Sequence, residues 1–242
     1  MMKYIMAAES RRLYDRMSGD KLSEKQKEQM KSLMSDNMKD TELMTALWIL
    51  SSILKEYYGK KVIILIDEYD VPLDKAFENN YYNEMIILLR NMLEQSLKTN
   101  DNLYMAVLTG CLRIARESIF TGLNNFNIFS ITDQYFDEYF GFTDKEVKEI
   151  LQYYKVPDAT PQPYWINTSG NYIVKRFIEK ANQQTRREIE QLIEGKAIQK
   201  EIRLELTYNE LDSTIENLWS VLFATGYLTQ QGKPLKRFLQ SI

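Results

Sequence analysis

The residues best suited to chemistry are three carboxylates that follow a continuous apolar run. Asp67, Glu68 and Asp70 come directly after Val62–Ile66, and Pro72 then breaks the segment. The run is β-branched and does not alternate, so it predicts a strand buried on both faces, as in a parallel sheet. Ligands of open α/β sheets bind at the carboxyl ends of such strands. Carboxylate oxygens placed there suit Mg²⁺, which prefers oxygen ligands and keeps several waters.

An apolar strand followed by Asp–Glu is also the Walker B pattern of nucleotide hydrolases. In this interpretation Asp67 holds Mg²⁺, with Asp70 in support, and Glu68 orients the water that attacks the γ-phosphate. The metal neutralises charge on the transferring group. A buried strand that meets an acidic surface turn gives the same pattern without any chemistry, so the pattern alone leaves both interpretations open.

The segments around this run predict an α/β fold. Leu43–Tyr57 has apolar residues at helical spacing, and Gly59 is its stop signal. Residues 80–98 carry a second helical stripe, and residues 103–108 form a second apolar run that ends at Thr109. The order helix, strand, helix, strand with short connections is typical of a parallel sheet flanked by helices.

Composition removes several classes of site. The 242 residues include no histidine and one cysteine, Cys111, and the net charge is −3. Catalytic triads with histidine, histidine-ligated metals, zinc fingers and iron–sulfur clusters are therefore excluded. Without a basic field we expect no direct nucleic-acid binding. No apolar run of about 18 residues and no signal-peptide pattern occur, so we expect a cytoplasmic protein without membrane contact.

The second half of the chain has a different character. Phe126–Ile131 is a candidate third strand, and Thr143–Glu146 is a capping box that opens a helix. Three prolines within residues 157–163 indicate a boundary. Beyond them the pattern is helical, and a final helix followed by Gly226–Thr229 suggests a small winged-helix-like unit with a short strand.

These observations divide the chain into three parts. Residues 1–156 form the predicted α/β core, residues 157–163 the linker and residues 164–242 the smaller, mainly helical domain.

Several long segments resemble one bacterial family in the same order. They are YYGKKVIILIDEYDVPLDKA, TNDNLYMAVLTGCLRIARESIFTGLNNFNIFSITD, YFGFTDKEVKEIL and YWINTSGN. The resemblance is to the AAA-ATPase-like family and covers about residues 10–157 and 163–233. It implies a P-loop NTPase-like fold with a helical lid, usually followed by a PD-(D/E)XK nuclease-like domain. It also implies ATP hydrolysis with Mg²⁺ and ATP as cofactors.

The resemblance gives roles to residues at and beyond the second strand. In AAA-like ATPases the neighbouring strand carries a sensor residue for the γ-phosphate or the attacking water, which here matches Thr109. Arg113 and Arg116 follow, and either guanidinium suits phosphate oxygens. Salt bridges to Glu117 or to the acidic turn are the alternative role for these arginines.

The sequence departs from the family in its phosphate loop. No G-x-x-x-x-G-K-[ST] occurs, and Tyr58–Lys61 is not a substitute. The Trp-, Tyr- and Gly-rich tract that normally precedes YWINTSGN is shortened to Lys155–Pro163, and no nuclease-like domain follows. We therefore expect a truncated or degenerate Mg–ATP module with Walker B but no Walker A, and little ATPase activity from this chain alone. The alternative is a non-catalytic protein-interaction module or regulatory subunit with a protein partner.

Overall fold

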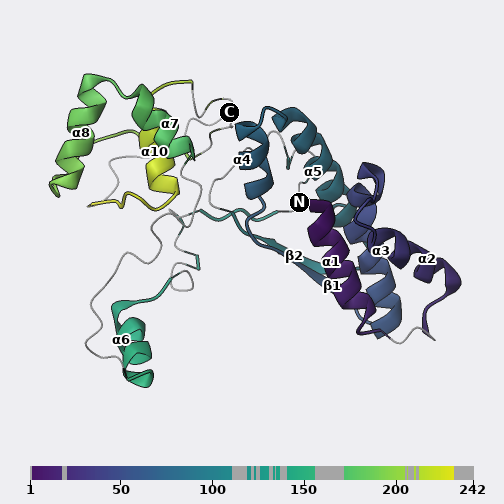
Figure 1. Cartoon of the computed structure of the whole chain (residues 1–242). Helices are drawn as coiled ribbons and strands as arrows, with labels where there is room; N and C mark the ends of the chain where they lie inside the picture. Colours follow the sequence, from purple (N-terminus) through teal and green to yellow (C-terminus); the bar gives the residue numbers. More distant parts are fainter. Residues whose placement is uncertain are drawn as a thin grey trace. The chain divides into compact units, whose positions relative to one another are not determined.

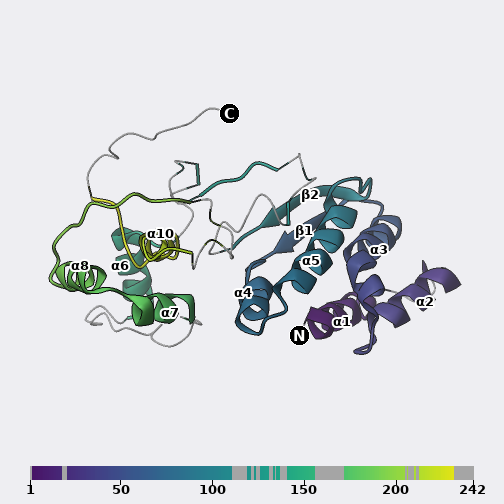
Figure 2. The same ribbon diagram turned by 90° about the horizontal axis from the view of Figure 1, so that it is seen from above.

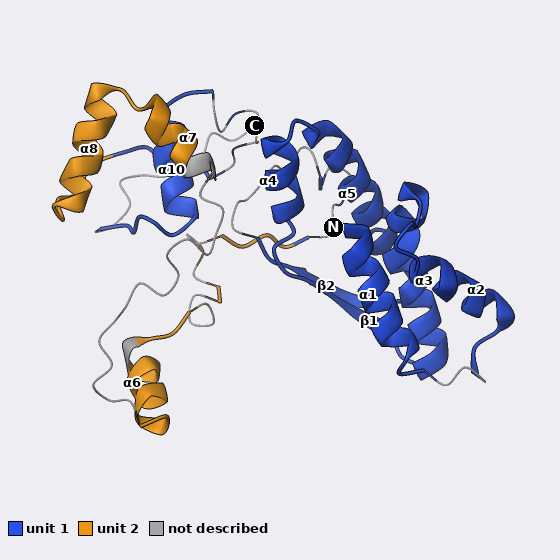
Figure 3. Cartoon of the chain, in the orientation of Figure 1, with its two compact units in different colours: residues 1–126, 200–242 blue, residues 127–199 orange. Residues whose placement is uncertain are grey.

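The computed structural model divides the chain into two compact units. One contains residues 1–126 and 200–242, and the other contains residues 127–199 (Figure 3). Within the described part of the chain, none of the helices combines the length and apolar character needed to cross a bilayer. The structure describes residues 2–17, 21–110, 119–120, 123, 126–130, 133, 135–136, 141–155, 172–204, 206, 210 and 213–231.

Three helices at the start of the chain pack on one another (Figure 1). They are α1 (Met2–Tyr14), α2 (Glu24–Leu33) and α3 (Asp40–Tyr58). Each contributes apolar side chains at helical spacing, and burying a large one stabilises the fold by roughly 1.5–3 kcal/mol. The buried residues of this cluster are Met17, Leu22, Met30, Leu33, Ala46, Leu50 and Ile53.

The ends of these helices are fixed by local signals. Ser23 caps α2, because its hydroxyl accepts the amide of Gln26 at 3.3 Å while the Gln26 side chain accepts the Ser23 amide at 2.9 Å. This reciprocal pair is a capping box. Gly59 ends α3 with a φ of 67°, as the sequence predicts, and glycine adopts this left-handed conformation at no steric cost.

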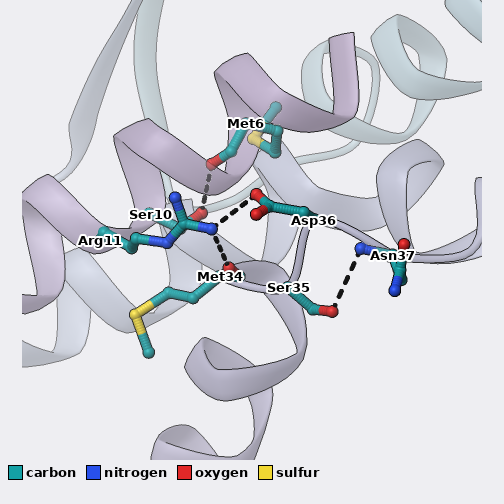
Figure 4. A network of polar contacts seen from close by, with 7 residues as sticks. All are labelled: Met6, Ser10, Arg11, Met34, Ser35, Asp36 and Asn37. Atoms are coloured by element: carbon teal, nitrogen blue, oxygen red, sulfur yellow. Dashed lines mark hydrogen bonds and ion pairs between the residues drawn. The ribbon is translucent and has the colours of Figure 1, made fainter. Parts of the chain in front are cut away.

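A polar contact ties α1 to the loop between α2 and α3 (Figure 4). Arg11 donates to the carbonyl oxygen of Met34 at 2.8 Å and to Asp36 Oδ1 at 2.6 Å. Within the loop the amide of Asn37 donates to the Ser35 hydroxyl at 3.3 Å. The ion pair is largely exposed, so it contributes at most about 1 kcal/mol, and its main effect is to fix the loop that leads into α3.

Two parallel strands form the sheet that carries the acidic segment. β1 (Val62–Ile66) pairs with β2 (Leu103–Leu108), with Ile64 opposite Ala106 and Ile66 opposite Leu108. The predictions of both strands and of their parallel pairing are confirmed. A bulge between Val62 and Ile63 shifts the register at the amino end.

The crossover between the strands consists of two helices. α4 (Val71–Glu78) begins directly after the acidic segment, and α5 (Tyr82–Leu97) confirms the helix expected over residues 80–98. α5 packs along α3, and these two helices contact β2 and β1 respectively (Figures 1 and 2). The parallel strands are thus joined by a helical crossover, as such a pair requires.

The prediction that β1 is buried on both faces is wrong. Ile64 is 8% exposed, whereas Ile63 and Leu65 are 55% and 73% exposed. Neighbouring side chains of a strand point to opposite faces, and in the described residues α3 and α5 contact the sheet on the side of Ile64. Met105 and Val107, the partners of Ile63 and Leu65 in β2, are 44% and 43% exposed, so the other face of the sheet is apolar and open.

The later region is mainly helical, as the sequence predicts. The second unit contains α6 (Asp144–Tyr153), α7 (Tyr172–Lys180) and α8 (Gln183–Ile193). α10 (Asn217–Ala224) belongs to the second segment of the first unit. The predicted capping box is confirmed, because the Thr143 hydroxyl accepts the Glu146 amide at 3.3 Å and Glu146 accepts the Thr143 amide at 2.8 Å.

Two predicted strands in this region are wrong. Residues 126–130 of the candidate strand Phe126–Ile131 have no regular structure, and Ile131 lies outside the described residues. The Asp133 side chain accepts the Ser130 amide at 2.7 Å, so this local turn removes a donor that a strand ladder would use.

The strand expected after Gly226 is also missing from the described residues. Gly226 has a φ of 81°, and the amide of Leu228 donates back to the carbonyl oxygen of Leu222 at 3.1 Å. This is a helix-terminating bond, so residues 227–229 close the end of α10 and do not form a winged-helix-like strand.

The division into residues 1–156, 157–163 and 164–242 stays a prediction. The expected linker lies outside the described residues, which stop at 155 and resume at 172. The compact units change over after residues 126 and 199.

Candidate functional site

The carboxyl ends of β1 and β2 meet, and the candidate site is built on them. The backbone pairing continues one step past the strands, because the amide of Thr109 donates to the carbonyl oxygen of Ile66 at 2.9 Å. The amide of Tyr69 then donates to the carbonyl oxygen of Thr109 at 3.0 Å. Thr109 is therefore held between the end of β1 and the turn that follows it.

Asp67 and Thr109 are brought together by this arrangement. The Thr109 hydroxyl donates a hydrogen bond to Asp67 Oδ1. Asp67 is exposed and Thr109 half-buried, so the carboxylate stays open to water and to ions. A hydroxyl donor satisfies part of the carboxylate and restricts its rotation, which prepares the remaining oxygen positions for a ligand.

Glu68 has an unusual backbone for its residue type. Its φ is 53°, in the left-handed region that non-glycine residues seldom adopt. The carbonyl oxygen of Glu68 accepts the amide of Val71 at 3.1 Å, which closes the turn into α4. The side chain is exposed beside Asp67. Strained conformations of this kind persist where the surrounding structure enforces them, often at functional sites.

Asp70 begins α4 and is 5% exposed. Its carbonyl oxygen accepts the amides of Leu73 and Asp74 at 2.9 and 3.0 Å. Burial raises the pKa of the Asp74 carboxyl; Lys75 acts in the opposite direction, and negative charge on Glu78 and Asp70 raises the pKa further. The carboxylates of Asp70 and Asp74 therefore lie close to one another at the start of α4, which follows the exposed residues Asp67 and Glu68.

The donor chemistry at this end of the sheet fits Mg²⁺. Asp67 and Asp70 offer carboxylate oxygens, and Thr109 adds a hydroxyl. Among the described residues there is no cluster of three or more carboxylate, cysteine or histidine side chains placed to hold a metal. Mg²⁺ does not need one, because it is usually held by one or two carboxylates, waters and substrate phosphates. The magnesium assignment to Asp67 and Asp70 stays a prediction.

Other residues considered in the sequence analysis lie away from this edge or outside the described residues. Gly59 to Lys61 precede β1, so they lie at the amino end of the sheet, opposite Asp67. Arg113 and Arg116 lie outside the described residues, and their phosphate role stays a prediction.

Sequence reasoning missed two features of this site. Pro72 occupies the first turn of α4, where its missing amide costs nothing, so the proline marks a helix start as well as a strand end. Gly110 lies so close to Tyr69 and Asp70 that a Cβ would meet their side chains at 2.7 and 2.9 Å. The pair Thr109–Gly110 was visible in the sequence, but nothing in it indicated this close approach.

Comparisons with known proteins found a matching family model and a relative, each over part of the chain. Residues 3–120 match the model of a family described as Predicted AAA-ATPase. An uncharacterized protein in the vnfD 5′ region of Azotobacter chroococcum mcd 1 is 30% identical over 94 residues. That alignment covers 38% of this chain and 18% of the relative. No solved structure matches.

Proposed function

We propose that the carboxyl end of β1 is a magnesium–nucleotide site in this chain, whose residues 3–120 match the model of a family described as Predicted AAA-ATPase. The observation that carries this proposal is the hydrogen bond from Thr109 to Asp67 where two neighbouring parallel strands end. Ligands of open α/β sheets bind at this edge.

Each residue has a role in this proposal. Asp67 binds the metal, directly or through its water shell, and Asp70 supports it from the buried side. Bound Mg²⁺ would neutralise charge on the phosphates. Glu68 accepts a hydrogen bond from the attacking water and orients it, while Thr109 keeps Asp67 in one rotamer.

Phosphate binding is the weak part of the site. The sequence has no G-x-x-x-x-G-K-[ST] loop, whose backbone amides and lysine would hold the β- and γ-phosphates. Binding by the chain alone therefore relies on the metal, and we expect a dissociation constant of about 1 mM, near −4 kcal/mol. Efficient hydrolysis requires a phosphate loop supplied by another segment or chain.

Calorimetric titration of the full chain with Mg²⁺–ATP tests the proposal. Asp67→Asn should weaken binding about tenfold, because the carboxylate charge on the metal is lost. Asp101→Asn is the matched control, since Asp101 is an exposed aspartate just before β2, at the opposite end of the sheet. Glu68→Gln should keep binding and remove any turnover. Equal effects of the Asp67 and Asp101 variants would contradict a metal site at Asp67.

A second candidate function is a non-catalytic interaction module, and the open face of the sheet favours it. Ile63, Leu65, Met105 and Val107 form a contiguous apolar face. Parallel sheets normally have both faces covered. Sedimentation measures whether this face associates: a concentration-dependent increase in mass that Leu65→Lys abolishes would support the module. A wild-type chain that stays monomeric at high concentration and binds Mg²⁺–ATP would favour the first proposal.

A further inference from the structure

Gly110 closes the acidic turn from the side of β2. A Cβ on Gly110 would lie 2.7 Å from Tyr69 Cε1, 3.0 Å from Tyr69 Cδ1 and 2.9 Å from Asp70 Oδ1. Non-bonded carbon atoms normally lie about 3.5–4.0 Å apart, so the present packing leaves no room for a methyl group. The φ of Gly110 is not in the left-handed region. The close packing therefore depends on the absence of a side chain at Gly110, and not on a backbone conformation that favours glycine.

The neighbours of Gly110 are held in place from other directions. The Tyr69 ring packs edge-on against Phe120, with ring centroids 5.4 Å apart and an interplanar angle of 65°. The Tyr69 amide is bonded to the carbonyl oxygen of Thr109. Asp70 is buried at the start of α4. A methyl group at Gly110 could be accommodated only by moving the ring, the start of α4 or the end of β2.

Such a movement would reach the exposed carboxylates. Glu68 lies between Asp67 and Tyr69 with a strained backbone, and the turn is closed by the bonds from Tyr69 to Thr109 and from Val71 to Glu68. Where the packing against Phe120 keeps the ring from rotating away, the Tyr69 backbone must move with it, and this lengthens the first of these bonds. Thr109 would then shift relative to Asp67, whose carboxylate its hydroxyl holds.

We propose that Gly110 is a positioning residue: its lack of a side chain lets Tyr69 and Asp70 close over the end of β2, and this contact holds the Asp67–Glu68 turn in its ligand-binding geometry. The link to nucleotide binding rests on the function proposed above, whereas the effect on the turn does not. Gly110 itself touches no ligand in this scheme.

Two measurements on the full chain test the proposal separately. Amide hydrogen exchange at Tyr69 reports the bond to Thr109 without any ligand, and Gly110→Ala should speed it at least tenfold. Electron paramagnetic resonance of Mn²⁺ in the presence of ATP reports the metal site, and the same variant should weaken Mn²⁺–ATP binding about tenfold. Gly59→Ala is the control, because Gly59 has a φ of 67° and open space around it at the amino end of the sheet. It should lower the melting temperature while leaving both measurements unchanged.

The outcomes distinguish this proposal from the proposed function. Wild-type exchange at Tyr69 in Gly110→Ala would overturn the positioning role. If the wild-type chain does not bind Mn²⁺–ATP, the nucleotide function fails, and the exchange measurement alone decides the role of Gly110. If Gly110→Ala does not fold, the double variant Tyr69→Ala, Gly110→Ala decides, because it removes both ring contacts and leaves only the Asp70 carboxylate, which can rotate away from the methyl group. Recovery of folding would support the proposal, and continued failure to fold would overturn it.

Discussion

The Thr109 hydroxyl donates a hydrogen bond to Asp67 Oδ1 across the ends of two parallel strands. These strands are separated in the chain by the 36 residues between Ile66 and Leu103. The contact depends on the register of the two strands. Ile66 lies opposite Leu108, and Asp67 and Thr109 are the residues that directly follow them. A shift of one residue would turn one of the two side chains to the other face of the sheet. The sheet therefore determines the chemistry at its edge.

Thr109→Val tests this contact, because valine keeps the shape of threonine and removes the hydroxyl. We expect a several-fold loss of Mn²⁺–ATP affinity, since Asp67 becomes free to rotate, and a stability cost near the lower end of the usual 0.5–1.5 kcal/mol for a hydrogen bond. Thr45→Val is a matched control, because the Thr45 hydroxyl donates to the carbonyl oxygens of Thr41 and Glu42 within α3. Equal loss of affinity in both variants would contradict a specific role for Thr109.

Glu68→Gly should stabilise the fold while removing the proposed water-orienting carboxylate. The left-handed conformation costs a non-glycine residue roughly 1–2 kcal/mol, and part of this gain is offset by the flexibility that glycine adds to the unfolded chain. We expect a net gain of about 0.5–1 kcal/mol, measured by urea unfolding. Asn80→Gly is a comparison at a φ of 62°, where asparagine tolerates the conformation better, so its gain should be smaller. A destabilised Glu68→Gly variant would show that the side chain makes compensating contacts.

The sequence predicted α3, α5, β1 and β2 in the first half of the chain because their signals are local, whereas α1 and α4 were missed. Apolar spacing and Gly59 define α3, a β-branched run defines β1, and a second apolar run defines β2. The burial of β1 could not be predicted, because an apolar run says nothing about how many faces neighbouring elements cover. Ile63 and Leu65 are as apolar as buried Ile64, and only the position of α3 and α5 distinguishes the exposed side chains from the buried one.

The polar residues of the site were predictable by type and position, but their precise setting was not. Asp67, Glu68 and Thr109 follow strands that the sequence identifies. The close approach at Gly110 arises from packing against residues 40 and 41 positions earlier in the chain, and no residue type in the sequence marks the left-handed backbone of Glu68. The strand expected at residues 126–131 is not formed for a related reason, since the described residues provide no strand to pair with it and Asp133 holds Ser130 in a local turn.

Asp74→Asn should change how stability depends on pH. Burial raises the pKa of Asp74, so the folded chain binds a proton more readily than the unfolded chain, and wild-type stability is gained as pH falls through the folded pKa. The variant should therefore be more stable than wild type at neutral pH, by less than about 1 kcal/mol because the half-exposed carboxyl is screened by solvent. This difference should shrink as pH falls below the ordinary aspartate pKa of 3.8, where the unfolded chain also becomes protonated. Urea unfolding at several pH values measures it, and a difference that grows on acidification would contradict the desolvated setting of Asp74.

The Thr143 capping box should make α6 sensitive to acid. The pKa of Glu146 is lowered because its carboxylate accepts hydrogen bonds from the amide and the hydroxyl of Thr143. This stabilisation is present above the ordinary pKa of a glutamate and is lost as pH falls through the lowered value. Thr143→Ala removes the cap and should cost the helix about 1 kcal/mol.

Amide exchange within residues 147–153 measures this effect directly. Thr143→Ala should raise exchange about fivefold at neutral pH, and Glu146→Gln should remove the acid dependence that the wild-type helix shows. Glu149→Gln is the matched control, because Glu149 lies on the same helix and its 3.8 Å contact with Lys145 is exposed. If all three variants exchange alike, the capping box does not hold the start of α6, and the order of that helix must come from contacts made elsewhere along it.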